Sequence, residues 1–171
     1  MSSRSRILQP MRDWLPWAPL IAAILHMCEE FIYPGGFPAW YRRYRTNNSR
    51  VTSRFLVIIN AVLLLACVDI GILGRSKLGV GYWMTVAALL CSNGIWHAWA
   101  SYKSHSYSPG VVSGVSVYVP LALYGYWQFL GSGAATFGTA LIAIIVGGSY
   151  QFWSTLYHRS LRVFSERRTP S

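Results

Sequence analysis

The chain has 171 residues, of which 53% are hydrophobic and 12% are charged, and its formal net charge is +10. A soluble domain carries about a quarter charged residues, so this composition excludes an ordinary soluble protein and indicates a polytopic membrane protein. The positive charge does not indicate nucleic-acid binding. The basic residues fall in loops and tails, where anionic lipid headgroups and the positive-inside rule explain them.

Five apolar segments follow one another along the chain. Each of the last four has roughly the 20 residues that a helix needs to cross a bilayer, and the connections between them are short. The segments cover residues 14–33, 55–73, 78–102, 111–130 and 134–157. The sequence therefore predicts an all-α, polytopic helix bundle with five transmembrane segments, folded as a single membrane-embedded domain over residues 1–171.

The first segment leaves an alternative open. Its uncharged core, Trp14 to Leu25, is short for a span and contains Pro16 and Pro19. A run of that length also fits a re-entrant helix. The alternative to five spans is thus four spans plus a re-entrant first helix.

Basic residues concentrate in three flanking regions. We expect a basic N-terminal arm at residues 1–13, a basic and aromatic interfacial loop at 34–54, and a basic C-terminal tail at 159–171. The positive-inside rule puts the basic loops and the C-terminus in the cytoplasm. We therefore expect a multi-pass protein of the cell membrane that contacts anionic lipid headgroups.

A histidine and two acids end the first segment. His26, Glu29 and Glu30 follow an uncharged run, and residues three and four apart share one face of a helix. A charge at the centre of a span costs about 3 kcal/mol or more. Ionisable residues in a membrane segment are therefore interpreted first as a functional site.

Further polar residues fall at the same depth as this group. Asn93 and His97 lie four residues apart near the end of the third segment, which runs parallel to the first in the five-span prediction. The fourth segment is entered through Tyr107, Pro109 and Gly110. We expect these side chains to converge in the cytoplasmic half of the membrane.

The three motifs together resemble those of the HXXEE family of small multi-pass membrane proteins. They are His26-x-x-Glu29-Glu30, Asn93-x-x-x-His97 and Tyr107-x-Pro109-Gly110, in this order, and they extend from the first segment to the start of the fourth. The resemblance implies multi-pass topology and an active site. It names no substrate, because the family has no settled reaction.

The residues themselves favour a metal site. Two histidines and one carboxylate form a catalytic zinc set with an open position for water, and the same set suits non-haem iron. The expected ligands of the divalent metal, Zn or Fe, are His26, Glu30 and His97. Glu29 could take the place of Glu30 as the ligand, and the spare glutamate would act as a general base on the activated water, so both are candidate catalytic residues. Asn93 would orient the substrate or its oxyanion, and Tyr107 is a further candidate catalytic residue. The expected function is metal-assisted hydrolysis of a lipophilic small molecule.

Two other functions remain open at this point. Adjacent carboxyl groups in apolar surroundings can provide a proton donor, and aromatic side chains, which make up 15% of the chain, could stabilise a carbocation. The candidates for such contacts are Trp83, Trp96, Trp99, Tyr118, Tyr124, Tyr126, Trp127 and Trp153. That combination would suit a metal-free acid–base isomerase or cyclase of a terpenoid or sterol-like substrate. Intramembrane glutamates and histidines also occur in proton-coupled carriers, and a lipid-binding scaffold needs no reaction at all.

Overall fold

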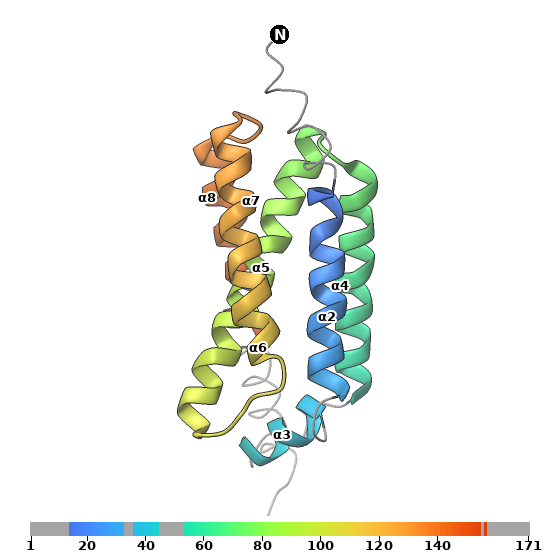
Figure 1. Cartoon of the computed structure of the whole chain (residues 1–171), viewed down its shortest axis with the longest axis vertical. Helices are drawn as coiled ribbons and strands as arrows, with labels where there is room; N and C mark the ends of the chain where they lie inside the picture. Colours follow the sequence, from blue (N-terminus) through green and yellow to red (C-terminus); the bar gives the residue numbers. More distant parts are fainter. Residues whose placement is uncertain (1–13, 33–35, 45–52, 155, 157–171) are drawn as a thin grey trace, which may run out of the picture.

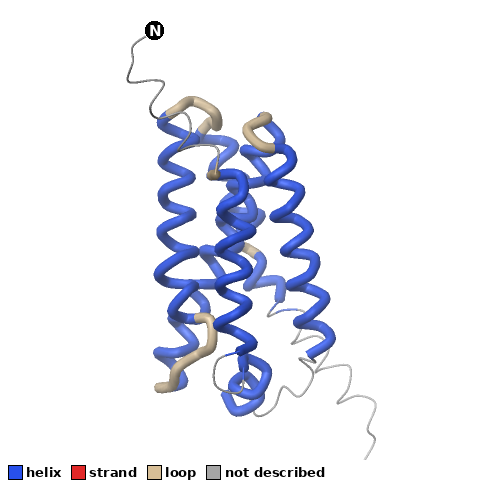
Figure 2. The backbone as a smooth tube through the Cα atoms, turned by 45° about the vertical axis from the view of Figure 1, so that its right-hand side comes forward, coloured by secondary structure: helices blue, strands red, loops and turns tan. Residues whose placement is uncertain are grey.

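The computed structural model describes residues 14–32, 36–44, 53–154 and 156, and over these residues the protein is all-α, as predicted. Figure 2 shows the described elements as helices joined by short loops. In chain order they are η2 (Leu15–Trp17), α2 (Ala18–Ile32), α3 (Gly36–Tyr44), α4 (Ser53–Leu73), α5 (Lys77–Ser104), α6 (Val111–Ser113), η3 (Gly114–Tyr118), α7 (Val119–Gly131) and α8 (Phe137–Gly148). The predicted N-terminal arm and C-terminal tail lie outside the described residues, as do residues 45–52 of the expected interfacial loop.

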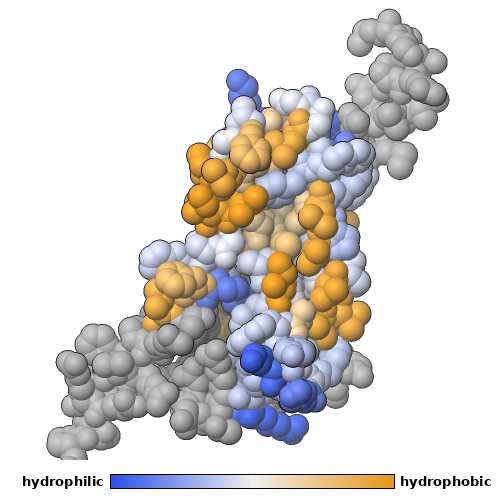
Figure 3. Space-filling view, turned by 90° about the vertical axis from the view of Figure 1, so that its left-hand side faces the viewer, coloured by the Kyte–Doolittle hydropathy of each residue, from blue (hydrophilic) through white to orange (hydrophobic). Residues whose placement is uncertain are grey.

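Among the described helices, three are long and apolar enough to cross a membrane: Leu15–Ile32, Leu56–Leu73 and Lys77–Ser104. Their outward faces are apolar as well. Large hydrophobic side chains on α4 and α8, such as Ile58 and Ile142, are more than 60% exposed, and apolar side chains cover much of the surface in Figure 3. A water-soluble surface rarely exposes patches of this size, so the protein is membrane-associated.

Both prolines of the first segment lie where a helix tolerates them. Pro16 is the second residue of the short 3-10 turn η2, and Pro19 lies in the first turn of α2. The backbone N–H groups of a first turn have no partner within the helix, so a proline there removes no hydrogen bond. These prolines therefore start the helix and do not interrupt it.

Residues 111–131 form one continuous helical run with a local widening. The π-helical turn η3 comes directly before α7, which has Pro120 in its first turn. Proline cannot donate the hydrogen bond that an α-helix would require there, and π turns are a usual way to accommodate such a break. The widened turn carries Tyr118 into the core, where its side chain is 1% exposed.

The long helix α5 is the centre of the bundle. It packs against α4, α7 and α8, and α2 packs on α4; the long helices run side by side in Figure 1. Gly94 of α5 meets Gly114 of η3 so closely that a Cβ on Gly94 would lie 2.5 Å from the Gly114 carbonyl oxygen. This contact brings the start of the fourth segment against the end of the third.

Part of the stretch expected as an interfacial loop is helical. Helix α3 lies across the lower end of the bundle in Figure 1. Its Phe37 and Tyr41 are buried against Leu56 of α4 and Trp96 of α5, whereas Arg42 and Arg43 are exposed. The helix thus covers the end of the bundle where the polar motifs were expected.

Candidate functional site

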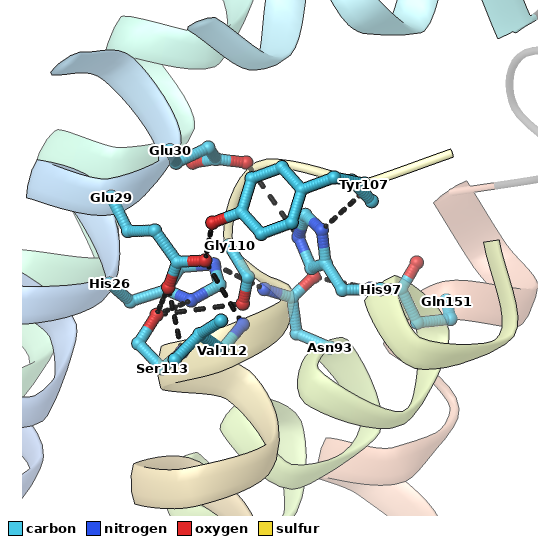
Figure 4. Close-up of polar contacts among 11 residues, drawn as sticks. His26, Glu29, Glu30, Asn93, His97, Tyr107, Gly110, Val112, Ser113 and Gln151 are labelled. Atoms are coloured by element: carbon cyan, nitrogen blue, oxygen red, sulfur yellow. Dashed lines mark hydrogen bonds and ion pairs between the residues drawn. The ribbon is translucent and has the colours of Figure 1, made fainter. Parts of the chain in front are cut away.

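His26, Glu30 and His97 form a buried cluster where α2 meets α5. One ligand atom from each residue lies within 4.8 Å of the other two, a spacing that could hold a metal ion. The Nε2 atom of His97 is 3.8 Å from Glu30 Oε1, and the two imidazole rings are 5.1 Å apart between centroids. The structure therefore brings together the three residues expected as metal ligands (Figure 4).

A serine holds each histidine at its Nδ1 atom. Ser113 Oγ lies 3.0 Å from His26 Nδ1, and Ser108 Oγ lies 3.0 Å from His97 Nδ1. Both serines are buried. Since the Nδ1 atoms are occupied, the Nε2 atoms are the ones that remain to face a shared ligand, and such outer hydrogen bonds fix the orientation of metal-binding histidines.

The backbone between the two serines fits against both imidazoles. Gly110 has a φ of 99°, a conformation that side-chain-bearing residues rarely adopt. A Cβ at this position would lie 2.7 Å from His26 Cε1 and 3.0 Å from His97 Cε1. Only glycine fits here, which gives a physical reason for the Pro109-Gly110 pair in the motif.

Glu29 points to a different set of partners from Glu30. It accepts hydrogen bonds from the Tyr107 hydroxyl and the Ser113 hydroxyl, and from the backbone nitrogens of Val112 at 3.0 Å and Ser113 at 2.6 Å. Four donors thus surround one carboxylate. The structure therefore brings Glu29 and Tyr107 together. The hydrogen bonds of Glu29 link α2 to the start of the fourth segment.

These contacts also define the tautomer of His26. An ionised Glu29 can only accept hydrogen bonds, so the Ser113 hydroxyl donates to it and must accept from His26 Nδ1–H. The proton of the neutral ring is then on Nδ1, and Nε2 carries a lone pair. A lone pair at Nε2 is what metal coordination requires.

The side chain of Asn93 faces His26 Nε2, and Gln151 sets the orientation of its amide. Gln151 donates from Nε2 to Asn93 Oδ1 at 2.9 Å. The amide nitrogen of Asn93 therefore donates to the lone pair of His26 Nε2, 3.2 Å away, and a metal bound at this nitrogen would take the place of this donor. The structure thus brings Asn93 to the cluster, together with a glutamine that follows α8.

A cavity of about 370 Å³ adjoins the cluster. Glu30, Asn93 and His97 line it, and Asn60 of α4 lines it beside Glu30. Most of its remaining wall is made of apolar side chains of α4 and α5. Tyr107, which is not among the lining residues, is 39% exposed. The cluster therefore adjoins an apolar cavity and lies near an exposed polar side chain.

The family described as "Protein of unknown function with HXXEE motif" matches residues 17–125. The chain belongs to the HXXEE family. This matched region contains every residue of the cluster and both serines, whereas Gln151 lies beyond it. No curated protein and no solved structure matches the chain.

The HXXEE motif alone did not reveal several residues of the site. Ser108, Ser113 and the role of Gly110 were missed, although Ser108 and Gly110 lie within the Tyr-x-Pro-Gly motif and Ser113 follows three residues later. A pair of small hydroxyl residues flanking a Pro-Gly turn was the available signal. Tyr118 was considered only as an aromatic face; its ring lies 4.6 Å from that of His26.

Most aromatic residues considered for carbocation binding lie away from the cavity. They are Trp83, Trp96, Trp99, Tyr118, Tyr124, Tyr126, Trp127 and Trp153, and among these only Trp96 lines the cavity. Trp83 is buried in the core and donates to the carbonyl of Leu15 at 2.8 Å. Trp127 and Trp153 are more than 60% exposed. Core packing and surface contact therefore account for these side chains.

Proposed function

We propose that this protein is an integral membrane hydrolase that binds a divalent metal through His26, Glu30 and His97 and acts on a lipophilic substrate. The observation that carries the proposal is the arrangement of the two imidazoles. Both are buried, both are held by a serine at Nδ1, and both are within reach of one carboxylate. Such a set is costly in an apolar interior unless its members meet a common partner.

The ligand set suits zinc first and iron second. Two histidines and a carboxylate leave a coordination position open, which separates catalytic zinc sites from structural ones, and the same set occurs in non-haem iron enzymes. When bound, the metal would polarise the scissile group and activate a water molecule. In this proposal the apolar substrate would occupy the cavity, and water would reach the metal from the exposed surface near Tyr107.

We assign Glu29 a positioning role in place of the general base expected from the sequence. Its oxygens already accept four hydrogen bonds, two of them from backbone nitrogens that cannot move away independently. A saturated carboxylate is poorly suited to accept a proton from water. Through Ser113 it instead keeps the lone pair of His26 at Nε2. Tyr107 supports Glu29 in this role.

A metal bound at His26 Nε2 would free the amide of Asn93 to donate to a substrate. Gln151 fixes the orientation of Asn93, so this amide nitrogen stays directed toward the cluster. A fixed donor of this kind stabilises negative charge that develops on a carbonyl oxygen. Asn93 would therefore orient the substrate and stabilise the oxyanion.

We further propose a five-span topology in the cell membrane, with the site at the cytoplasmic end. In this proposal the continuous helical run of residues 111–131 and the apolar helix α8 with the residues that follow it would be two spans in addition to the three long helices. Arg42 and Arg43 on the exposed side of α3 suit anionic headgroups at that end. The buried Phe37 and Tyr41 anchor the same helix to the bundle.

Elemental analysis of the purified protein tests the metal proposal. We expect about one transition metal per chain in the wild type, and loss of the metal in His97→Ala and His26→Ala. His105→Ala is the matched control, because His105 is exposed and lies outside the cluster. Full activity of a metal-free sample would instead favour the acid–base isomerase.

A further inference from the structure

The cavity beside the cluster is a channel that runs along helices α4 and α5. On α4, Leu56, Ile59, Leu63 and Ala66 line it, and their spacing of three to four residues places them on one face of the helix. On α5 the lining residues recur in the same way from His97 back to Tyr82. At 1.5 Å per residue, the α4 wall extends for about 15 Å and the α5 wall for about 22 Å.

One end of this channel is polar and closed. Phe37 and Tyr41 of α3 pack on Leu56 and Trp96 and cover the end next to the cluster. Phe37 reaches the cluster itself, with its ring centroid 5.3 Å from that of His97. A ligand group with hydrogen-bonding atoms is therefore expected at this end.

The rest of the channel is apolar. Beyond Asn60 and Asn93 the walls consist mainly of leucine, valine and alanine side chains. The hydroxyl of Thr85 is already used, since it donates to the carbonyl of Gly81 in its own helix at 2.9 Å. A polar ligand would find few partners there, whereas a hydrocarbon chain would bury its surface favourably.

One wall of the channel reaches the lateral surface of the bundle. The channel is walled by α4 and by residues 150–154, which follow α8, and α4 and α8 both pack on α5. Val62 of α4 lines the cavity and is also 59% exposed. A membrane lipid would therefore enter sideways beside Val62, without first leaving the bilayer.

We propose that the channel binds the hydrocarbon chain of a single-chain amphipathic lipid ester, with its polar group at Glu30, Asn93 and His97. The volume of about 370 Å³ is near the lower limit for ligand pockets, about 300 to 1,000 Å³, and favours one chain over two. The choice of an ester rests on the proposed hydrolase function. The choice of a single apolar chain rests on the cavity alone.

Photolabelling in detergent micelles tests the chain site. The probe is a 16-carbon alkyl ester with a diazirine at the far end of its chain, compared with a diacyl phosphatidylcholine that carries the same group. We expect the single-chain probe to label the channel walls near Ala66 and Val86, and the two-chain probe to label them weakly. Strong labelling of the channel by the diacyl probe would overturn the single-chain assignment.

A pair of tryptophan variants on α4 provides the matched control. Ala66→Trp fills the far end of the channel and should reduce channel labelling about tenfold. Ala61→Trp adds the same side chain at an exposed position of the same helix and should leave labelling unchanged. Leu63→Phe is a milder second obstruction should Ala66→Trp fail to fold. Equal labelling of the blocked and control variants, or labelling confined to the outer face of α4, would overturn the proposal.

The same probe separates this inference from the proposed function. In His97→Ala we expect ester hydrolysis to be lost and channel labelling to persist, because the chain site needs no metal. Channel labelling in a wild-type protein that hydrolyses no ester would refute the hydrolase and retain the chain site. Hydrolysis with labelling elsewhere would refute the chain site alone.

Discussion

Glu29 accepts two hydrogen bonds from Ser113, one from its backbone nitrogen at 2.6 Å and one from its hydroxyl. The same hydroxyl lies 3.0 Å from His26 Nδ1. A carboxylate, a serine and a histidine thus form a chain that leads toward the proposed metal position. Carboxylate partners of metal-binding histidines commonly act in this way, by fixing the ring and its tautomer. The serine extends the reach of this carboxylate by one hydrogen bond.

Removal of the serine hydroxyl should weaken metal binding without abolishing it. Ser113→Ala leaves His26 in position but frees its Nδ1, and loss of an outer partner typically lowers metal affinity about 10- to 100-fold. Competition with a chelator of known affinity measures the change. Ser116→Ala is the control, since the Ser116 hydroxyl donates to the carbonyl of Val112 on the exposed side of the same segment. Equal affinities of Ser113→Ala and wild type would exclude the relay.

The two adjacent glutamates should respond differently to the same substitution. Glu30→Gln replaces a ligand and should abolish stoichiometric metal binding. Glu29→Gln should retain the metal with reduced affinity, because the amide would turn a donor toward the backbone nitrogens of Val112 and Ser113. Elemental analysis and thermal unfolding in detergent separate the two effects. Complete loss of metal in Glu29→Gln with unchanged stability would identify Glu29 as the ligand.

A methyl group on Gly110 should disrupt both histidines at once. The added Cβ of Gly110→Ala would lie within 3.0 Å of both rings, and the φ of 99° adds backbone strain of about 1 to 3 kcal/mol. Gly133→Ala is a matched control, because Gly133 has a φ of 71° and no atom of the described residues lies within 4 Å of the added Cβ. We expect both variants to lose stability and only Gly110→Ala to lose the metal. Metal binding by Gly110→Ala at wild-type affinity would contradict the close fit of Gly110 against the two imidazole rings.

The convergence of the cluster could be predicted from the sequence because it depends on helix geometry and depth. His26 and Glu30 are four residues apart, and His97 ends a parallel segment at the same depth, so their meeting follows from short connections and the cost of isolated charges in lipid. The all-α fold follows from the apolar segments in the same way. Neither inference requires the conformation of a loop to be known.

The hydrogen-bond partners could not be predicted because they depend on loop conformation. The contacts of Ser108 and Ser113 require a left-handed Gly110, and Ser113 meets His26 across 87 positions of the chain. The separate roles of Glu29 and Glu30 depend on helix rotation. Successive residues point about 100° apart, and a pattern that groups them on one face does not say which neighbour each one meets.

The close approach of Gly94 and Gly114 holds α5 against the start of the fourth segment beside the site. Its contribution can be tested by measuring the stability of variants. The Cβ of Gly94→Ala would lie 2.5 Å from the carbonyl oxygen of Gly114, so the two helices would have to separate. Overpacking of this kind costs about 1 to 3 kcal/mol. We expect a lower melting temperature in detergent and reduced metal affinity, since the separation moves Ser113 away from His26.

The control for this prediction lies on the same helix. Within the part of the chain that the structure describes, a Cβ at Gly81 would meet only Thr139 Cγ2, at an ordinary 3.8 Å. Alanine is the better helix former by up to about 1 kcal/mol, so Gly81→Ala should be neutral or stabilising. If Gly81→Ala and Gly94→Ala had the same melting temperature, helix propensity and not helix contact would govern both positions.

Tyr118 provides a test of the protein interior next to His26. Its side chain is 1% exposed, and among the described residues its hydroxyl has no hydrogen-bond partner. An unsatisfied buried hydroxyl costs about 1 to 3 kcal/mol. Tyr118→Phe keeps the ring that packs on His26, so we expect the free energy of unfolding to stay the same or to rise.

Tyr126→Phe is the matched control and should lose about 1 kcal/mol, because the Tyr126 hydroxyl donates to the carbonyl of Met84 at 3.0 Å. If Tyr118→Phe kept its stability but lost hydrolytic activity, the Tyr118 hydroxyl would be assigned to substrate binding. A loss of stability as large as that of Tyr126→Phe would show that the Tyr118 hydroxyl does have a hydrogen-bond partner.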